Sequence, residues 1–115
     1  MPYLKLDTNL ELDSKTTKEL LSKSSAKLSS VLGKPESYVL VHINSGQTMM
    51  FAGSTDPLAY LELKSIGLLY DQAPSLSALF CEFIAEELNI PANRVYIEFT
   101  DIPREMWGWD SRTFA

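Results

Sequence analysis

The chain has 115 residues, of which 45% are apolar and 22% charged, and its net charge is -5. This length suits one domain with its own core, so residues 1–115 are expected to form a single domain. The acidic balance argues against nucleic acid and anionic membranes as partners, because both need a surplus of Lys and Arg. No apolar run suggests a leader or a membrane span, and the lone Cys81 cannot form an internal disulfide, so the expected location is the cytoplasm.

The chain starts with a strand pattern, YLKLDT at 3–8, directly after Met1 and Pro2. Apolar and polar residues alternate in it, as in a strand with one buried face. If Met1 is removed, Pro2 carries a free secondary amine on a rigid ring. An ordinary α-amino group titrates at about 7.7–8.0, so modest tuning would make this amine a base at neutral pH. If Met1 is retained, the Pro2 nitrogen is an amide without basicity, and the proline is only a common second residue.

An internal repeat divides the chain. YLKLDT at 3–8 reads again as YLELKS at 60–65, and each copy precedes a helix pattern and a second strand. The second strands share one spacing, in which Pro35 or Pro91 precedes three alternating apolar residues. Two tandem β-α-β units therefore fill most of the sequence. Because such crossovers are right-handed, both helices are expected on one face of a four-stranded mixed sheet, an α/β fold (α+β in some schemes).

Two helices are expected between these strands. The first is expected over about 16–32, with Thr16 starting a capping box and Gly33 as its C-terminal cap. The second is expected over about 76–88, where apolar residues recur at helical spacing, with Ser75 as its N-cap. The cysteine beside that apolar stripe is expected to be packed and inert.

The two faces of the expected sheet differ in character. The set facing the helices is Leu4, Leu6, Val39, Val41, Ile43, Leu61, Leu63, Val95, Ile97 and Phe99. The opposite set is mixed and rich in aromatic residues: Tyr3, Lys5, Tyr38, Leu40, His42, Tyr60, Glu62, Lys64, Tyr96 and Glu98. Parallel pairs are normally covered on both faces, and no chain remains for another layer, so a partner subunit is expected. Segments 47–51 and 106–109 are candidate edge strands that could pair with a neighbour.

Signals for metal and phosphate chemistry are weak. Residues 33–35, GKP, lack the remainder of a phosphate loop, and His42 has no ligand partner at suitable spacing. No metal and no cofactor are therefore predicted, and one histidine cannot support a Ser-His-Asp triad. Several aromatic residues form either the core of a subunit interface or the wall of a pocket, and periodicity slightly favours the interface. These residues are Tyr96, Trp107, Trp109 and Phe114.

Several spaced motifs together point to a known family. They are Met1-Pro2 with Thr8-Asn9, Gly33-Lys34-Pro35 with Tyr38, Met50-Phe51-Ala52-Gly53-Ser54, Ser65-Ile66-Gly67, Arg94-Val95-Tyr96-Ile97, Gly108-Trp109 and Ser111-Arg112-Thr113-Phe114-Ala115. With these motifs in this order, the chain resembles the macrophage migration inhibitory factor family of the tautomerase superfamily over essentially its whole length. The resemblance implies two β-α-β repeats assembled as a homotrimer around a central channel.

The resemblance also implies an activity. It suggests a cofactor-independent keto–enol tautomerase acting on 2-oxo acids such as phenylpyruvate, with Pro2 as the general base. Such a base needs a pKa of about 6–7 at neutral pH, and the charge of Lys34 would lower the pKa of the amine. Lys34 matches the family lysine that binds the substrate carboxylate, and Ser65 and Ile66 match the strand end whose amide approaches the substrate. The matching aromatic wall is Tyr38, Trp107, Trp109 and Phe114, and Tyr96 and Glu98 would reach in from the neighbouring subunit.

Two positions depart from the family pattern. Family members usually carry asparagine where this chain has Glu98, and a carboxylate there would raise the pKa of the Pro2 amine and repel an anionic substrate. We therefore expect weaker turnover of phenylpyruvate, or preference for another substrate. Residues 58–61, LAYL, stand where the vertebrate cytokine has C-x-x-C, so thiol–disulfide activity is not expected.

Two alternatives remain open at the level of sequence. One is a cytokine-like protein that binds a receptor through its surface, which would need neither a free Pro2 nor Lys34. The other is a trimer whose site has drifted and whose role lies elsewhere, a possibility raised by Glu98.

Overall fold

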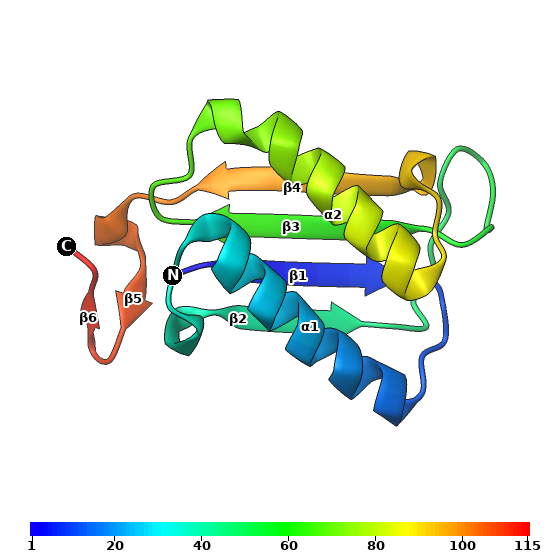
Figure 1. The fold of residues 1–115 in the computed structure, drawn as a ribbon, viewed down its shortest axis with the longest axis horizontal. Coiled ribbons are helices and arrows are strands. Elements are labelled where there is room, and N and C mark those ends of the chain that lie inside the picture. The colour runs from blue at the N-terminus through cyan, green and yellow to red at the C-terminus, as the bar shows by residue number, and fades with distance from the viewer.

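A computed structural model describes residues 1–115, which form two layers (Figure 1). The sheet has the order β2-β1-β3-β4. Its strands are β1 (Tyr3–Thr8), β2 (Leu40–Asn44), β3 (Ala59–Ser65) and β4 (Val95–Asp101). The pairs β1–β2 and β3–β4 are parallel, whereas β1 and β3 are antiparallel. The helices α1 (Ser14–Leu32) and α2 (Ala73–Leu88) both cross one face, so the predicted pair of β-α-β units is confirmed.

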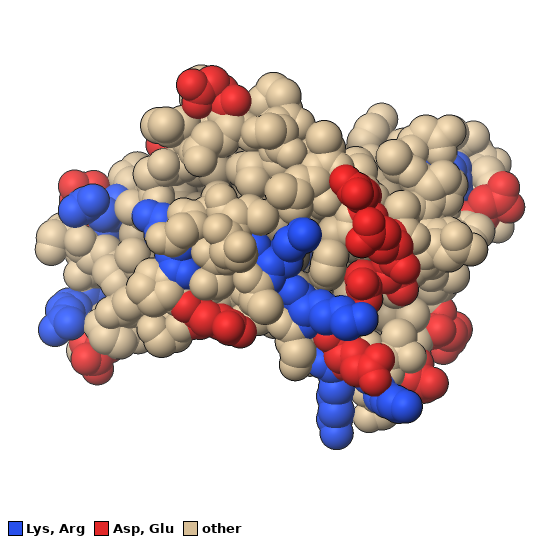
Figure 2. Space-filling view, in the orientation of Figure 1, with Lys and Arg blue, Asp and Glu red and all other residues tan.

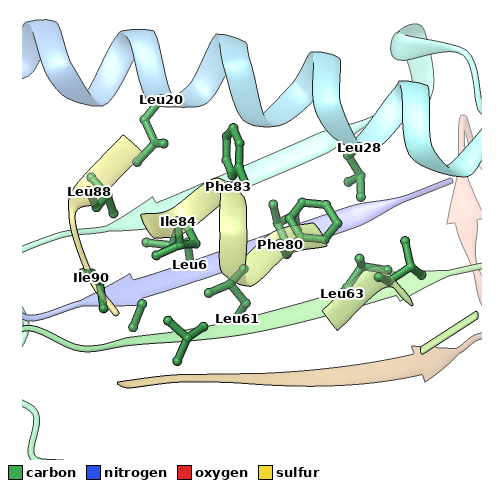
Figure 3. Packing of buried hydrophobic residues seen from close by; sticks show 14 of the residues in the cluster. Leu6, Leu20, Leu28, Leu61, Leu63, Phe80, Phe83, Ile84, Leu88 and Ile90 are labelled. Atoms are coloured by element: carbon green, nitrogen blue, oxygen red, sulfur yellow. The ribbon is translucent and has the colours of Figure 1, made fainter. Parts of the chain in front are cut away.

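The core lies between this face and the helices (Figure 3). Leu4 and Leu6 of β1 and Leu61 and Leu63 of β3 are at most 1% exposed, whereas the residues between them are half-buried. Each such buried side chain stabilises the fold by about 1.5–3 kcal/mol relative to an exposed one. Phe80 of α2 packs into the same layer and is fully buried. The alternation read from the repeat therefore identifies the buried face correctly.

The start of α1 differs from the prediction. The helix begins at Ser14, and the Asp13 carboxylate accepts a hydrogen bond from the Thr16 backbone N–H at 2.7 Å. Asp13 is thus the N-cap, and the prediction of Thr16 as the capping residue is wrong, because Asp13 satisfies that free N–H one turn earlier. The C-terminal end agrees with the prediction: Gly33 has φ +62° and its N–H donates to the Ser29 carbonyl.

The start of α2 also lies earlier than expected. The helix begins at Ala73, and Pro74 occupies its first turn, where a missing N–H costs no hydrogen bond. The Ser75 hydroxyl donates to the Gln72 carbonyl at 3.1 Å, so Ser75 is not the N-cap and that prediction is wrong. The helix ends at Leu88, and the next residue, Asn89, has φ +57° and donates its N–H to the Ala85 carbonyl.

The two candidate edge strands are not strands of the main sheet. Residues 47–50 form no strand, and Phe51 makes only a single bridge with Ser54. The chain leaves β2 through hydrogen bonds to the end of β1, since the Gln47 N–H donates to the Thr8 carbonyl at 3.0 Å. Within 106–109, only β5 (Gly108–Trp109) is extended, and it pairs with β6 (Arg112–Thr113) in a hairpin of its own.

The sheet face opposite the helices is covered by charged and aromatic side chains. Lys5 Nζ lies 3.5 Å from Asp7 and 3.6 Å from Glu62, and Lys64 Nζ lies 3.5 Å from Glu62. Tyr38, placed in this set by the sequence, lies instead in a 3-10 turn (Glu36–Tyr38) before β2. No second layer of this chain covers the face, as the sequence predicted.

The helix face carries interspersed charges of both signs (Figure 2). Lys23 of α1 and Glu87 of α2 form an ion pair at 2.9 Å that joins the two helices. Exposed pairs of this kind contribute little, about 0–1 kcal/mol. No helix is both long enough and apolar enough to cross a membrane.

Candidate functional site

A hollow of about 320 Å³ lies at the end of the sheet where β1 begins. Three segments meet there: the N-terminus, the turn before β2 and the C-terminal hairpin, which Figure 1 shows close together. Its lining residues are Met1, Ser37, Tyr38, Val39, Leu40, Trp107, Gly108, Trp109 and Phe114. The sequence-predicted aromatic wall, Tyr38, Trp107, Trp109 and Phe114, is therefore brought together in one place.

Three of these rings form a packed cluster. Tyr38 meets Trp109 edge-on at 5.5 Å between centroids, and it meets Phe114 in the same way at 5.8 Å. Trp109 and Phe114 are stacked at 5.7 Å with their planes 9° apart. Each such pair adds about 0.5–1.5 kcal/mol beyond burial, so the cluster holds the end of the chain against the turn before β2. The result is a rigid apolar wall that suits a flat aromatic group.

Pro2 lies behind Met1 and its side chain is fully buried. Its carbonyl accepts a hydrogen bond from the Leu40 N–H at 3.0 Å. Because Tyr3 pairs with Lys64 in the antiparallel ladder, one further step places Pro2 opposite Ser65. The start of β1 is thus held between β2 and β3 rather than left free.

The first residue of the chain has a perturbed amino group. Burial lowers the pKa of the Met1 amine below its ordinary value, and the positive charge of Lys34 lowers this pKa further. Lys34 is held at the C-terminal end of α1, where its N–H donates to the Ser29 carbonyl at 3.1 Å. Both effects disfavour a charged nitrogen, so this location keeps an amine available as a base.

The end of β3 forms another side of this region. Ser65 and Ile66 are only 1% and 7% exposed. The turn after them is held by Asp101, whose Oδ1 accepts hydrogen bonds from the N–H groups of Gly67 (3.0 Å) and Leu68 (3.2 Å). The sequence analysis missed Asp101, because its contact joins two segments that are paired only once β3 and β4 lie side by side.

Tyr96 and Glu98 lie elsewhere in the chain. Tyr96 pairs with Tyr60, which in turn pairs with Asp7, five residues along β1 from Pro2. At about 3.3 Å per residue, these five residues place Tyr96 roughly 16 Å from Pro2 along the strand direction. Tyr96 lines a second hollow, of about 400 Å³, at the opposite end of the sheet. One chain therefore carries Tyr96 at the end of the sheet opposite Pro2, whereas Glu98, which pairs with Glu62 and through it with Lys5, lies nearer the middle.

Glu98 is not free on this face. Its carboxylate accepts a hydrogen bond from the Tyr60 hydroxyl at 3.0 Å. Burial and this bond raise the pKa of Tyr60 to about 12. The sequence placed both residues on the open face but did not show that they are paired across β3 and β4.

No group of three or more His, Cys, Asp or Glu side chains is arranged to hold a metal ion. The hollow instead has Met1 and aromatic rings in its lining, and Lys34 is close enough for its charge to act on the Met1 amine. Arg112 and Trp109 pair with each other in the hairpin, and the Arg112 guanidinium lies 5.3 Å from the centroid of the Trp109 ring. These groups can attract a small anion and hold an aromatic ring beside a base.

Comparison with known proteins agrees with this arrangement. A macrophage migration inhibitory factor homologue from Prochlorococcus marinus has a similar crystal structure, with a TM-score of 0.91 and 38% identity over 98% of this chain and 99% of its own. Together, the two β-α-β units and these structural neighbours define the class as proteins of the tautomerase fold.

The sequence comparisons identify the family. The family model described as macrophage migration inhibitory factor matches residues 1–115. A homologue from Brugia malayi is 44% identical over 116 residues, and the Xenopus tropicalis macrophage migration inhibitory factor is 42% identical, each over the full length of both chains. The chain belongs to the macrophage migration inhibitory factor family.

Proposed function

We propose that this protein, once Met1 has been removed, is a cofactor-independent keto–enol tautomerase of phenylpyruvate-like 2-oxo acids. The observation that carries the proposal is the hollow at the head of β1, where the N-terminus lies against the aromatic wall and where burial and Lys34 lower the pKa of the amine. Removal of Met1 would pass this environment to the secondary amine of Pro2. A base of this kind works best when its pKa lies near the working pH.

The proposed reaction moves one proton and needs no other reactant. The Pro2 nitrogen takes a proton from C3 of the 2-oxo acid and then gives that proton to the C2 oxygen, which forms the enol and regenerates the free amine. The reverse sequence ketonises the enol. Lys34 pairs with the substrate carboxylate, and the backbone at Ser65 and Ile66 lies beside it. The phenyl ring packs against Tyr38, Trp107, Trp109 and Phe114, which line the hollow.

We propose further that the working unit is a homotrimer. Tyr96 lies roughly 16 Å and Glu98 roughly 10 Å along the sheet from Pro2, so they would complete the site of a neighbouring copy. Tyr96 is 65% exposed and Leu40 is 59% exposed, which leaves apolar surface at both ends for such contacts. Light scattering measures the number of subunits directly, and a monomer that retains full activity would contradict the shared site.

The principal experiment combines intact mass with a phenylpyruvate ketonisation assay. We expect mature protein that starts at Pro2, and a Pro2→Ala variant reduced about 10²-fold or more in kcat, the effect of a positioned base. Lys34→Ala should mainly raise KM, by roughly 10- to 150-fold, since it removes a hydrogen bond to a charged group. Lys18→Ala, which changes an exposed lysine of α1, is the matched control. Mature protein with no activity, or activity unaffected by Pro2→Ala, would refute the proposal.

Glu98 should limit the rate. Its carboxylate, contributed by a neighbour, would raise the pKa of the Pro2 amine and repel an anionic substrate. Glu98→Asn should therefore turn over phenylpyruvate faster at neutral pH, whereas Glu105→Gln, an exposed carboxylate on the turn before β5, should not. A Glu98→Asn variant no faster than the parent would count against this role.

A cytokine-like role is the second candidate. The observation in its favour is the 42% identity to a vertebrate protein named macrophage migration inhibitory factor, over the full length of both chains. The family includes tautomerases and cytokine-like members, so both activities are open to this chain. Receptor binding that survives Pro2→Ala would support this candidate, and its loss in that variant would oppose it.

A further inference from the structure

Arg94 makes more hydrogen bonds than any other side chain at the Tyr96 end of the sheet. It ends the short turn Ala92–Arg94 that leads into β4. Its guanidinium donates to backbone carbonyls of the 51–57 loop, at 2.7 Å to Phe51, 3.1 Å to Ser54, 2.8 Å to Asp56 and 3.3 Å to Pro57. Only a planar fork with several donors can meet these acceptors together, so lysine could not replace it.

The same guanidinium reaches Tyr96 through an aromatic ring. It lies 5.2 Å from the centroid of Phe51, and the Phe51 ring lies 4.6 Å from the Tyr96 ring. Arg94 ends the turn before β4 and Tyr96 is the second residue of β4, and both contact the Phe51 ring. Phe51 therefore fills the space between the loop that Arg94 holds and the tyrosine.

Without this contact, little of this chain would hold Tyr96. Its side chain is 65% exposed and its hydroxyl makes no hydrogen bond within the chain. The loop itself has one other side-chain anchor near its end, since Asn9 donates to the Thr55 carbonyl at 2.8 Å and accepts from the Leu58 N–H at 3.0 Å. Asn9 thus holds only the part of the loop from Thr55 onward, whereas Arg94 bonds carbonyls from Phe51 to Pro57 and is the anchor that reaches Phe51.

We propose that Arg94 is a positioning residue: it fixes the 51–57 loop so that Phe51 orients Tyr96 for substrate binding in the neighbouring copy. This role rests on the proposed function, in which Tyr96 completes that site. Orienting a wall residue before the substrate arrives avoids the entropic cost of ordering it upon binding. Arg94 itself does not touch the substrate and acts only through Phe51.

The experiment compares Arg94→Lys with the parent in the full-length protein. Arg94→Lys keeps the charge and loses the fork, and Phe51→Leu keeps the loop hydrogen bonds and loses the ring. The matched control is Arg104→Lys, because the Arg104 side chain is exposed and makes no hydrogen bond or ion pair. Light scattering and thermal unfolding establish that each variant is folded and assembled like the parent.

The first readout is NMR without substrate. Arg94→Lys should lose the nuclear Overhauser contacts between the Phe51 and Tyr96 rings and should speed amide exchange over 51–57. Retention of these contacts in Arg94→Lys would overturn the proposal, whatever the activity. If the parent itself does not ketonise phenylpyruvate, the proposed function fails, and the NMR result alone decides whether Arg94 positions Tyr96.

The second readout is kinetic. Arg94→Lys and Phe51→Leu should each raise KM by roughly two- to tenfold, the effect of losing one aromatic contact, with kcat changed less than about twofold. In a Tyr96→Ala background, Arg94→Lys should have no further effect on KM, because the two residues act as one unit. An equal rise in KM in that background, or a fall in kcat alone, would overturn the proposal.

Discussion

The α1 helix contains one polar group that the fold leaves without a partner. Ser24 is 0% exposed, between Leu20 and Leu28 on the buried stripe, and its hydroxyl makes no hydrogen bond. We predict that Ser24→Ala stabilises the protein. The gain should come from removing a hydroxyl that gives up its hydrogen bond to water on folding and obtains none in return.

The size of the effect follows from three contributions. An unsatisfied buried hydroxyl costs about 1–3 kcal/mol. Alanine is better than serine inside a helix by roughly 0.5 kcal/mol. Loss of one oxygen opens a void of about 10 Å³, which costs about 0.2 kcal/mol at the usual penalty for cavities. The first contribution is the largest, so Ser24→Ala should raise the free energy of unfolding by about 1–3 kcal/mol.

The assay is chemical denaturation, read as a shift in midpoint at constant m-value. It should be run at two protein concentrations, because assembly couples stability to concentration. Ser30→Ala, an exposed serine of the same helix, reports helix propensity alone and should shift the midpoint much less. Destabilisation by Ser24→Ala, or a gain no larger than that of Ser30→Ala, would refute the reasoning, since the hydroxyl would then have a partner.

Three further predictions concern titration and helix ends. Glu98→Gln should lower the pKa of Tyr60 from about 12, because it removes a negative charge beside the hydroxyl. The control Glu105→Gln should leave this pKa unchanged. Tyrosinate absorbance measures the pKa in both variants, and an unchanged titration in Glu98→Gln would exclude the hydrogen bond between Tyr60 and Glu98. The raised pKa of Tyr60 means that its contribution to stability is complete below the unfolded pKa and is lost as the pH rises through the folded value. The Thr16 N–H lowers the pKa of the Asp13 carboxyl in the folded protein. The stability difference between the parent and Asp13→Ala should therefore be present above the pKa that Asp13 has in the unfolded chain, and it should shrink as the pH falls through the pKa that Asp13 has in the folded protein. A difference that does not depend on pH in denaturation curves would contradict the role of Asp13 as the cap. Gly33→Ala should cost about 1 kcal/mol in the same assay, because φ is +62° with nothing within 4 Å of an added Cβ, and an unchanged midpoint would show that the backbone strain is absent.

Much of the fold could be predicted because its signals are local. Alternation in 3–8 and 60–65 identified the buried face of two strands, and the helical stripe over 76–88 identified α2. The ends of helices were harder, because Asp13 and Thr16 stand within one turn of each other and either can cap a free N–H. Segment 47–51 pairs with no strand of its own chain apart from the Phe51–Ser54 bridge, so its pairing with a neighbouring copy stays a prediction.

The candidate site was only partly accessible from the sequence. Resemblance to a family named Tyr38, Trp109 and Phe114 as one wall, and the structure brings the three rings within 5.8 Å of one another. Asp101 and Arg94 were missed as anchors of two loops, since each bonds backbone groups more than thirty residues away.

The sequence by itself determined the tandem β-α-β units, their buried faces and the two helices, because repeats and periodic patterns reflect contacts between near neighbours in the chain. Only the tertiary structure decided that the amine and the aromatic wall meet at one end of the sheet, near enough to Lys34 for its charge to act on the amine, while Tyr96 lies at the other end and Glu98 in the middle of β4. The physical reason is strand pairing: the antiparallel alignment of β1 with β3 sets the direction of the second unit against the first. The start of β4 therefore lies at the same end of the sheet as the end of β1, away from Pro2.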